Sequence, residues 1–148
     1  MDKKIRAMQE EILRVFAKDA GDFALSGGTA LELYYLHHRF SADLDFFSPK
    51  YDIEEIERLV HGFKKTTAKS IKFQSGFTTP NRAQVRFYEV TIIAYNRPLK
   101  IDFVEDVIFK KPPIKKFAAI PVYSVENIYM QKIFSVTGTT LGQDDIGR

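Results

Sequence analysis

The alternation of polar and apolar residues in RFSADLDFF, residues 39–47, constrains the fold more than any other stretch of the chain. In a β-strand, side chains two residues apart project from the same face. Asp43 and Asp45 would therefore share a polar face, while Leu44 and Phe46 would share the opposite, apolar face. This period of two predicts a strand over residues 39–47 that buries one side only.

Helical spacing of apolar residues predicts four helices, over residues 3–18, 29–37, 53–63 and 124–136. Asp52 and Ser124 are the expected caps at the starts of the last two. The inward side of the last helix is expected to carry Val125, Ile128, Tyr129, Ile133 and Val136.

Further strands are predicted over residues 71–77, 85–95 and 99–104, with the last two joined as a hairpin through residues 95–98. The segment KKPPIKK, residues 110–116, is predicted to be irregular, because adjacent prolines remove hydrogen-bond donors and fix φ. The order α-α-β-α-β-β-β-α indicates an α+β fold with a mixed, mainly antiparallel sheet and flanking helices.

Size and composition favour one globular domain over residues 1–148, because 45% of the residues are hydrophobic and 28% are charged. The chain has no cysteine, which excludes disulfides and thiolate metal sites, so a bound metal would be a hard cation held by carboxylates. No apolar run approaches the roughly 20 residues that span a bilayer. The polar start, MDKKIRAMQEE, lacks the apolar core of a secretion signal, so we expect a cytoplasmic protein without membrane contact.

The two aspartates of the strand form the first candidate site. Their Cα atoms would be about 7 Å apart by strand rise, so the two charges repel unless a divalent cation lies between them. A pair of this kind is also common on a solvated edge. Asp102, inside the apolar strand LKIDFV, is a third acid in a place where aspartate is rare. If the two strands are neighbours, three carboxylates suit two Mg²⁺ ions on substrate phosphates; the alternative is that Asp102 pairs with Lys100 or Arg86.

Gly27 and Gly28 form the second candidate site, because they precede a predicted helix. Glycines let a ligand approach the backbone, and a helix start offers free N–H groups to phosphates. Thr29 and Ser26 could add hydroxyl groups to such a site. The alternative is an ordinary tight turn in which Ser26 caps the helix.

Gly27-Gly28 followed by the Asp43-Leu44-Asp45-Phe46 strand resembles the signature of the DNA polymerase β-like nucleotidyltransferase superfamily. The sequence motif GGTAL followed by HRFSADLDFF is similar to that of the AbiEii/AbiGii-type nucleotidyltransferases, known as toxins of toxin–antitoxin systems. The resemblance extends to residues 100–103 and, more weakly, to residues 124–134. It implies a polymerase β-like palm fold.

The resemblance also implies roles for individual residues. Asp43, Asp45 and Asp102 would be the catalytic metal ligands, holding two Mg²⁺ ions or Mn²⁺, with Asp102 as a base for the incoming hydroxyl. The nucleotide would be bound by the residues Gly27, Gly28, Thr29, Arg39, Ser41 and Lys132. For Lys132, the alternative is a side chain that only extends from the edge of the core.

The implied function is transfer of a nucleoside monophosphate from an NTP to an acceptor hydroxyl, with tRNA or other RNA as acceptor and a cognate antitoxin as partner. Two alternatives stay open: a nucleotide- or RNA-binding module of the same fold, suggested by the basic KKPPIKK segment, and a small-molecule (antibiotic) nucleotidyltransferase. Family members continue into a further helical region, whereas this chain stops at GQDDIGR. The chain is therefore either a minimal member or one without its C-terminal part.

Overall fold

The computed structural model describes residues 3–37, 39–92 and 98–134. In chain order its elements are α1 (Lys3–Asp19), β1 (Ala24–Ser26), α2 (Gly27–Ala30), the π-helix η1 (Leu31–Leu36), β2 (Leu44–Ser48), α3 (Ile53–Thr67), β3 (Ile71–Thr78), β4 (Gln84–Val90), β5 (Leu99–Glu105), β6 (Ile114–Phe117) and β7 (Ile120–Tyr123). Residues 125–134 form a further helix, which we call the 125–134 helix.

One sheet of seven strands organises the described residues, in the order β3-β4-β5-β2-β1-β7-β6. Four neighbouring pairs are antiparallel, namely β3–β4, β4–β5, β1–β2 and β6–β7. The pairs β2–β5 and β1–β7 are parallel. The prediction of an α+β fold with a mixed, mainly antiparallel sheet is therefore confirmed.

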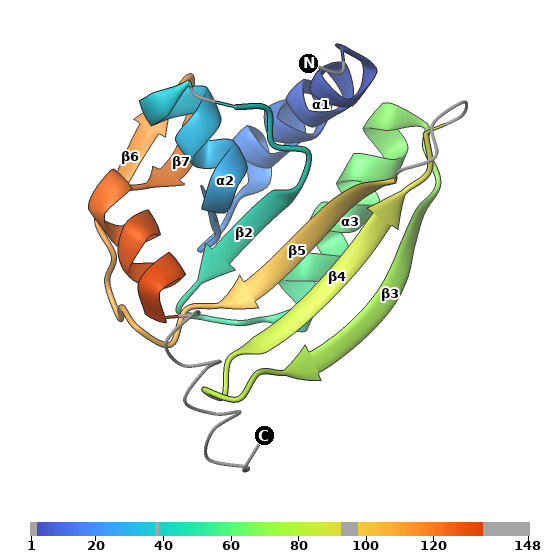
Figure 1. Cartoon of the computed structure of the whole chain (residues 1–148). Coiled ribbons are helices and arrows are strands. Elements are labelled where there is room, and N and C mark those ends of the chain that lie inside the picture. The colour runs from blue at the N-terminus through green and yellow to red at the C-terminus, as the bar shows by residue number, and fades with distance from the viewer. Residues whose placement is uncertain (1–2, 38, 93–97, 135–148) are drawn as a thin grey trace, which may run out of the picture.

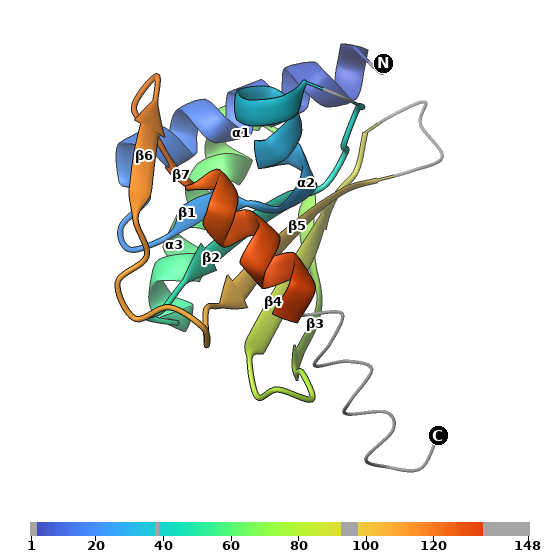
Figure 2. The same cartoon turned by 60° about the vertical axis from the view of Figure 1, so that its left-hand side comes forward.

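The helices lie on both faces of the sheet (Figures 1 and 2). α1 and α3 lie behind it, whereas α2 and the 125–134 helix lie in front. The apolar face of β2 meets the rear helices, where the Phe46 ring lies 4.2 Å from that of Phe16 and 6.2 Å from that of Phe63 between centroids. The front face of β2, β5 and β4 is left partly open (Figure 1). Asp45 and Asp102 precede Phe46 and Phe103, whose rings pack together in the rear core, so the two acids lie on the front face.

Several predicted elements are confirmed with their caps. The Asp52 side chain accepts a hydrogen bond from the Glu54 N–H, 3.0 Å, and caps α3. Ser124 Oγ accepts from the Asn127 N–H, 3.3 Å, at the start of the 125–134 helix. β4 and β5 pair as the expected hairpin, although residues 93–97, which include most of its turn, lie outside the described part of the chain.

The predicted strand over residues 39–47 is wrong at its beginning, because β2 starts only at Leu44. The three-residue strand β1 was not expected, since it is too short to show a period. The prediction that residues 110–116 are irregular is wrong for Ile114 onward, where β6 begins directly after Pro113 and pairs with β7. The second helix begins at Gly27 rather than at Thr29 and continues as η1.

The inward side of the 125–134 helix also differs from expectation. Tyr129 and Ile133 are 43% and 59% exposed, while Asn127 and Gln131 are buried beside Ile128. Val136 lies outside the described residues. The helix therefore turns two amide side chains, as well as an apolar one, toward the sheet.

The sequence predicts a chain without a membrane-spanning helix. Within residues 3–37, 39–92 and 98–134, every helix is too short or too polar to cross a bilayer.

Candidate functional site

Two of the predicted acids stand side by side on the open face of the sheet. β2 and β5 pair in parallel with Asp45 directly opposite Asp102. The two strands are therefore neighbours, which is the condition under which Asp102 could join the acids of the first strand. Asp43 lies one residue before β2 and is exposed, so it belongs to the connecting segment and not to the strand.

The charges of this acid cluster influence one another strongly. Burial, followed by the nearby carboxylates of Asp102 and Asp43, raises the pKa of Asp45 to about 8. Burial and Asp43 also raise the pKa of Asp102, against the opposing effect of Lys100. A hydrogen bond between the two side chains favours the protonated form of Asp45 and the ionised form of Asp102. In the absence of a cation, Asp45 therefore holds a proton near neutral pH.

Lys100 is the only cation that the structure places in ion-pair contact with Asp102 among the described residues. Its Nζ lies 3.7 Å from Asp102 Oδ2 and 4.6 Å from the centroid of the Phe87 ring. The other predicted partner, Arg86, pairs instead with Glu57 at 2.6 Å. The second Asp102 oxygen, Oδ1, is buried without a hydrogen-bond partner. One Asp102 oxygen is thus paired and the other is available to a ligand.

The glycine pair lies in contact with this cluster. Gly27 has φ +75°, and a Cβ added to it would lie 2.2 Å from Asp45 Oδ2. A Cβ added to Gly28 would lie 3.0 Å from Ser41 Oγ. A side chain at position 27 would therefore be strained in its backbone and would displace the carboxylate. The glycines and the acids belong to one site.

The first turn of α2 keeps its amide donors free of a side-chain cap. Ser26 occupies the N-cap position but makes no capping hydrogen bond. Its hydroxyl donates instead to Oε1 of Gln131, on the 125–134 helix. The alternative in which Ser26 caps the helix is therefore wrong, and the Ser26 side chain leaves the N–H groups of the first turn uncapped.

Buried polar side chains hold the segment that leads into Asp43. Gln9 donates from Nε2 to the carbonyls of Ser41, 2.8 Å, and Ala42, 2.7 Å. Glu32 accepts from the Ser41 N–H at 2.9 Å. Thr29 is fully buried, and its hydroxyl donates to the Asp43 carbonyl. Thr29 thus touches the backbone of the acid segment, where the sequence predicted contact with a triphosphate.

Gln9, Glu32 and Gln131 were not predicted as site residues. For Gln9 a signal existed, since it lies in the buried stripe of α1 between Met8 and Ile12. Glu32, on η1, forms an ion pair with Arg6 of α1, and both side chains are largely buried. Nothing in the sequence around Gln131 indicated a role in the site, because its role comes from a hydrogen bond with Ser26, which is distant in sequence. These residues position the site from elements far apart in the sequence.

The two predicted cationic residues lie at the surface. Arg39 is exposed in the connection before β2, and Lys132 is exposed on the 125–134 helix next to buried Gln131. Neither is brought into ion-pair contact with Asp45 or Asp102 within the described residues. Their expected roles toward phosphates stay predictions.

Asp45 and Asp102 match part of the ligand shell of a magnesium ion. Among the described residues, no three His, Cys, Asp or Glu side chains converge as a complete metal site. Mg²⁺ commonly binds through one or two carboxylates and takes its other ligands from water and substrate phosphates. Asp45 and Asp102 supply such a pair, and Asp102 Oδ1 is unpartnered. The pair therefore fits a magnesium ion that is bound together with a phosphate-bearing ligand.

Solved structures with the same fold come from Helicobacter pylori. One, a proposed nucleotidyltransferase, superposes with a TM-score of 0.60 at 16% identity over 90% of this chain and 59% of that chain. Another, JHP933, gives a TM-score of 0.59 at 17% identity over 90% of this chain and 57% of that chain. The chain thus spans less than three fifths of either relative's length. No functionally curated protein matches the sequence.

The sequence itself matches a family over most of its length. Residues 11–145 match the family described as "Nucleotidyl transferase AbiEii toxin, Type IV TA system". This range includes the glycine pair, all three acids and Lys132, and it confirms the resemblance that the motifs indicated. The chain belongs to the AbiEii nucleotidyltransferase toxin family.

Proposed function

We propose that this chain transfers a nucleoside monophosphate from a magnesium-bound NTP to an acceptor hydroxyl. One observation carries the proposal: Gly27 lies against the Asp45 carboxylate, which stands directly beside Asp102. A phosphate-binding turn and a carboxylate pair in contact are what nucleotidyl transfer needs at its donor site.

The triphosphate lies on the first turn of α2 in this proposal. The uncapped N–H groups at Gly27, Gly28 and Thr29 donate to phosphate oxygens, helped by the partial positive charge of the helix start. Ser41, beside Gly28, adds a hydroxyl. The exposed cations Arg39 and Lys132 approach the outer phosphates and neutralise their charge.

Asp43, Asp45 and Asp102 hold Mg²⁺, for which Mn²⁺ can substitute, and the NTP phosphates complete the ligand set. When bound, the metal ions neutralise and polarise the phosphates, as in other two-metal phosphoryl transfers. Because its pKa is raised, the Asp45 carboxyl would have to lose its proton in order to hold a cation.

The chain's own residues position the reacting groups. The acceptor oxygen attacks the α-phosphorus, and the bond from this phosphorus to the bridging oxygen breaks, so that pyrophosphate leaves. Asp102 is the base that accepts the proton of the attacking hydroxyl. Catalysis rests on alignment and on charge neutralisation, with no covalent enzyme intermediate.

The proposal also covers the fold type, the acceptor, the location and the protein partner. The sheet takes the place of a polymerase β-like palm, tRNA or other RNA supplies the acceptor hydroxyl in the cytoplasm, and a cognate antitoxin restrains the activity. Membership of a toxin–antitoxin family supports the last of these.

Substitution of the acids tests the proposal. We expect Asp45→Asn and Asp43→Asn to reduce Mg²⁺-dependent transfer of labelled NMP into total RNA by at least about 100-fold, since each removes transition-state charge stabilisation. Asp22→Asn, at an exposed acid far from the cluster in sequence, is the control and should retain transfer. Circular dichroism checks the fold of each variant. Undiminished transfer in either acid variant would contradict the proposal.

A nucleotide-binding module without chemistry is the second candidate. It is favoured by the exposed position of Asp43 outside β2 and by the lack of a ready three-acid metal site among the described residues. Saturable NTP binding without incorporation of label into RNA, protein or an antibiotic would support this candidate. Label in any of these acceptors would instead identify the acceptor class.

A further inference from the structure

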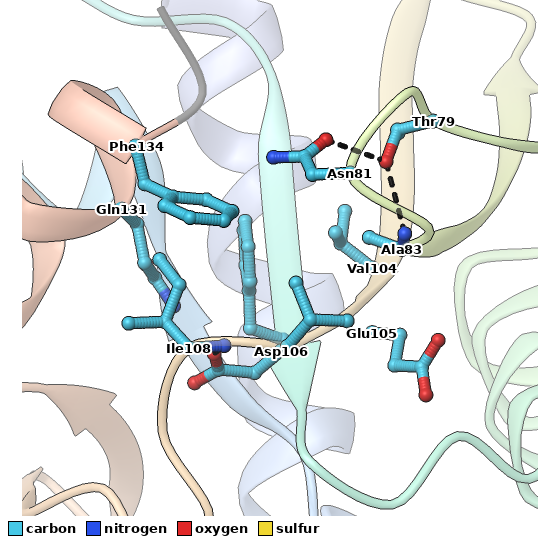
Figure 3. A pocket seen from close by; sticks show the side chains of 11 residues that line it. Thr79, Asn81, Ala83, Val104, Glu105, Asp106, Ile108, Gln131 and Phe134 are labelled. Atoms are coloured by element: carbon cyan, nitrogen blue, oxygen red, sulfur yellow. Dashed lines mark hydrogen bonds between the residues drawn. The ribbon is translucent and has the colours of Figure 1, made fainter. Parts of the chain in front are cut away.

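A cavity of about 90 Å³ lies beyond the acid pair on the same face of the sheet. Figure 3 shows it between the 125–134 helix, which contributes Gln131 and Phe134, and the β3–β4 turn, which contributes Thr79 and Asn81. Its floor and walls are largely apolar, with Phe47, Val104, Ile108 and Phe134 among the lining residues. The cavity is therefore a largely apolar slot, with the amides of Gln131 and Asn81 and the carboxylates of Glu105 and Asp106 among its polar groups.

The register of the sheet fixes where this slot lies relative to the site. Phe47 and Val104 are opposite one another in the β2–β5 pair, two residues beyond Asp45 and Asp102 on the same face. Two residues of strand correspond to about 7 Å. β1 runs antiparallel to β2 with Ser26 opposite Asp45, so Gly27 lies on the other side of the acids. The glycine turn, the acids and the slot thus follow one another along β2.

Gln131 presents an unsatisfied polar group at this slot. Its side chain is buried, 7% exposed, and its Oε1 accepts from the Ser26 hydroxyl. Its Nε2 has no hydrogen-bond partner. A buried amide donor without a partner is costly, so its presence beside a cavity indicates a ligand that accepts a hydrogen bond there.

Asn81 faces Gln131 from the opposite wall. Its Oδ1 accepts from the Thr79 hydroxyl at 2.9 Å. Figure 3 shows the nitrogen end of the Asn81 amide directed away from Thr79, toward Phe134. Two amide side chains, each anchored by a hydroxyl at one end, therefore offer their other ends at opposite edges of an apolar slot.

We propose that this slot binds the nucleobase of the NTP and that Gln131 is a residue that determines which base is preferred. The inference rests on the proposed function, because it places the triphosphate on the glycine turn and the α-phosphate at the acids. A nucleobase has apolar faces that pack against Phe47 and Phe134, and carbonyl or ring-nitrogen acceptors at its edges for the amides. A site that donates to a base edge rejects bases without a matching acceptor.

Binding measurements with and without a base test this inference. The affinities of Mg²⁺ complexes of ATP, GTP, CTP, UTP and inorganic tripolyphosphate are measured by calorimetry for the wild type and for Gln131→Met. We expect the wild type to prefer one NTP by about tenfold or more, and Gln131→Met to bind the four NTPs within about threefold of one another. Tripolyphosphate occupies only the glycine turn and the acids, so its affinity reports separately any effect of Gln131→Met that passes through Ser26.

A matched pair of exposed positions on the 125–134 helix gives a second readout that does not disturb the core. Phe134 lines the slot and is 38% exposed, whereas its neighbour Ile133, 59% exposed, does not line it. Phe134→Ala should weaken binding of the preferred NTP about tenfold and leave tripolyphosphate unchanged. Ile133→Ala should change neither. If Gln131→Met fails to fold, this pair decides the question.

The outcomes separate this inference from the proposed function. NTPs that bind no better than tripolyphosphate, or a base preference that survives both Gln131→Met and Phe134→Ala, would overturn the nucleobase slot and leave nucleotidyl transfer intact. Absence of Mg²⁺-NTP binding together with absence of transfer would overturn the proposed function, and with it the slot. A changed tripolyphosphate affinity in Gln131→Met would show that Gln131 acts through Ser26 on the glycine turn, and would also contradict a base-reading role.

Discussion

The protonation state of Asp45 depends on its burial and on the neighbouring groups of the candidate site. The glycine turn packs against its carboxyl group, and two other carboxylates surround it. With a folded-state pKa of about 8 against a reference of 3.8, the folded chain holds one proton more than the unfolded chain between these pH values. Linkage then requires the free energy of unfolding to fall as pH rises through this window.

We expect Asp45→Asn to remove that pH dependence, because the amide resembles the protonated carboxyl and does not ionise. Urea unfolding without Mg²⁺ should show the variant gaining stability over the wild type, on the order of a few kcal/mol, between pH 5 and pH 8. Mg²⁺ should raise the free energy of unfolding of the wild type at pH 8 and leave that of the variant unchanged. Asp22→Asn serves as the control and should follow the wild-type curve. Identical slopes for the wild type and Asp45→Asn would show that Asp45 ionises normally in the folded chain.

At the scale of elements, the connection between η1 and β2 is ordered by side chains instead of by a neighbouring strand. The carbonyls of Ser41 and Ala42 accept from Gln9, and the Ser41 N–H donates to Glu32. These side-chain hydrogen bonds replace the backbone hydrogen bonds that a longer β2 would have made with a neighbouring strand. They explain why alternation alone predicted a strand from residue 39, whereas pairing begins at Leu44.

The substitution Gln9→Met tests this account, because it keeps the volume of the side chain and removes both donors. We expect faster hydrogen exchange at the amides of residues 41–43 and a stability loss of about 1–3 kcal/mol, as two part-buried carbonyls lose the Gln9 donor. Glu10→Met, at the exposed neighbouring position of α1, should change neither. Unchanged exchange in Gln9→Met would mean that Thr29 and Glu32 suffice to hold the segment.

Elements with a long, consistent period were predictable from sequence, and those defined by tertiary contacts were not. α1 and α3 bury one face over four or more turns, so spacing and the Asp52 cap identify them. β1 has three residues that are all buried, and β6 follows a proline pair, so neither shows a local pattern. Asp102 could be singled out from sequence because aspartate is rare amid apolar strand residues, whereas its position opposite Asp45 depends on the pairing of two strands that the sequence left open.

At the scale of the whole molecule, a buried hydrogen bond joins strands that are three positions apart in the sheet. Asp106, just after β5, accepts from the Tyr123 hydroxyl of β7 at 2.8 Å, and both residues are buried. The same carboxylate accepts from the backbone N–H groups of Ile108 and Phe109. The bond therefore reaches past β2 and β1 and connects the two halves of the sheet at one end.

We expect Tyr123→Phe to lower the free energy of unfolding by about 1–3 kcal/mol, since one Asp106 oxygen is then left buried without its partner. Urea denaturation at pH 7 measures the loss. Tyr129→Phe removes a hydroxyl from a tyrosine that is 43% exposed and should cost less than about 0.5 kcal/mol. Equal stability of the two variants would show that the bond does not hold the halves of the sheet together.

The contact between Ser26 and Gln131 joins residues 105 positions apart. During synthesis on a ribosome, the glycine turn and the acids of β2 emerge early, while Gln131 is among the last described residues to be made. β1 likewise waits for β7, since Leu25 pairs with Val122. An interrupted chain therefore carries the glycine turn and the acids without the helix that holds Ser26, so premature termination leaves the candidate site incomplete.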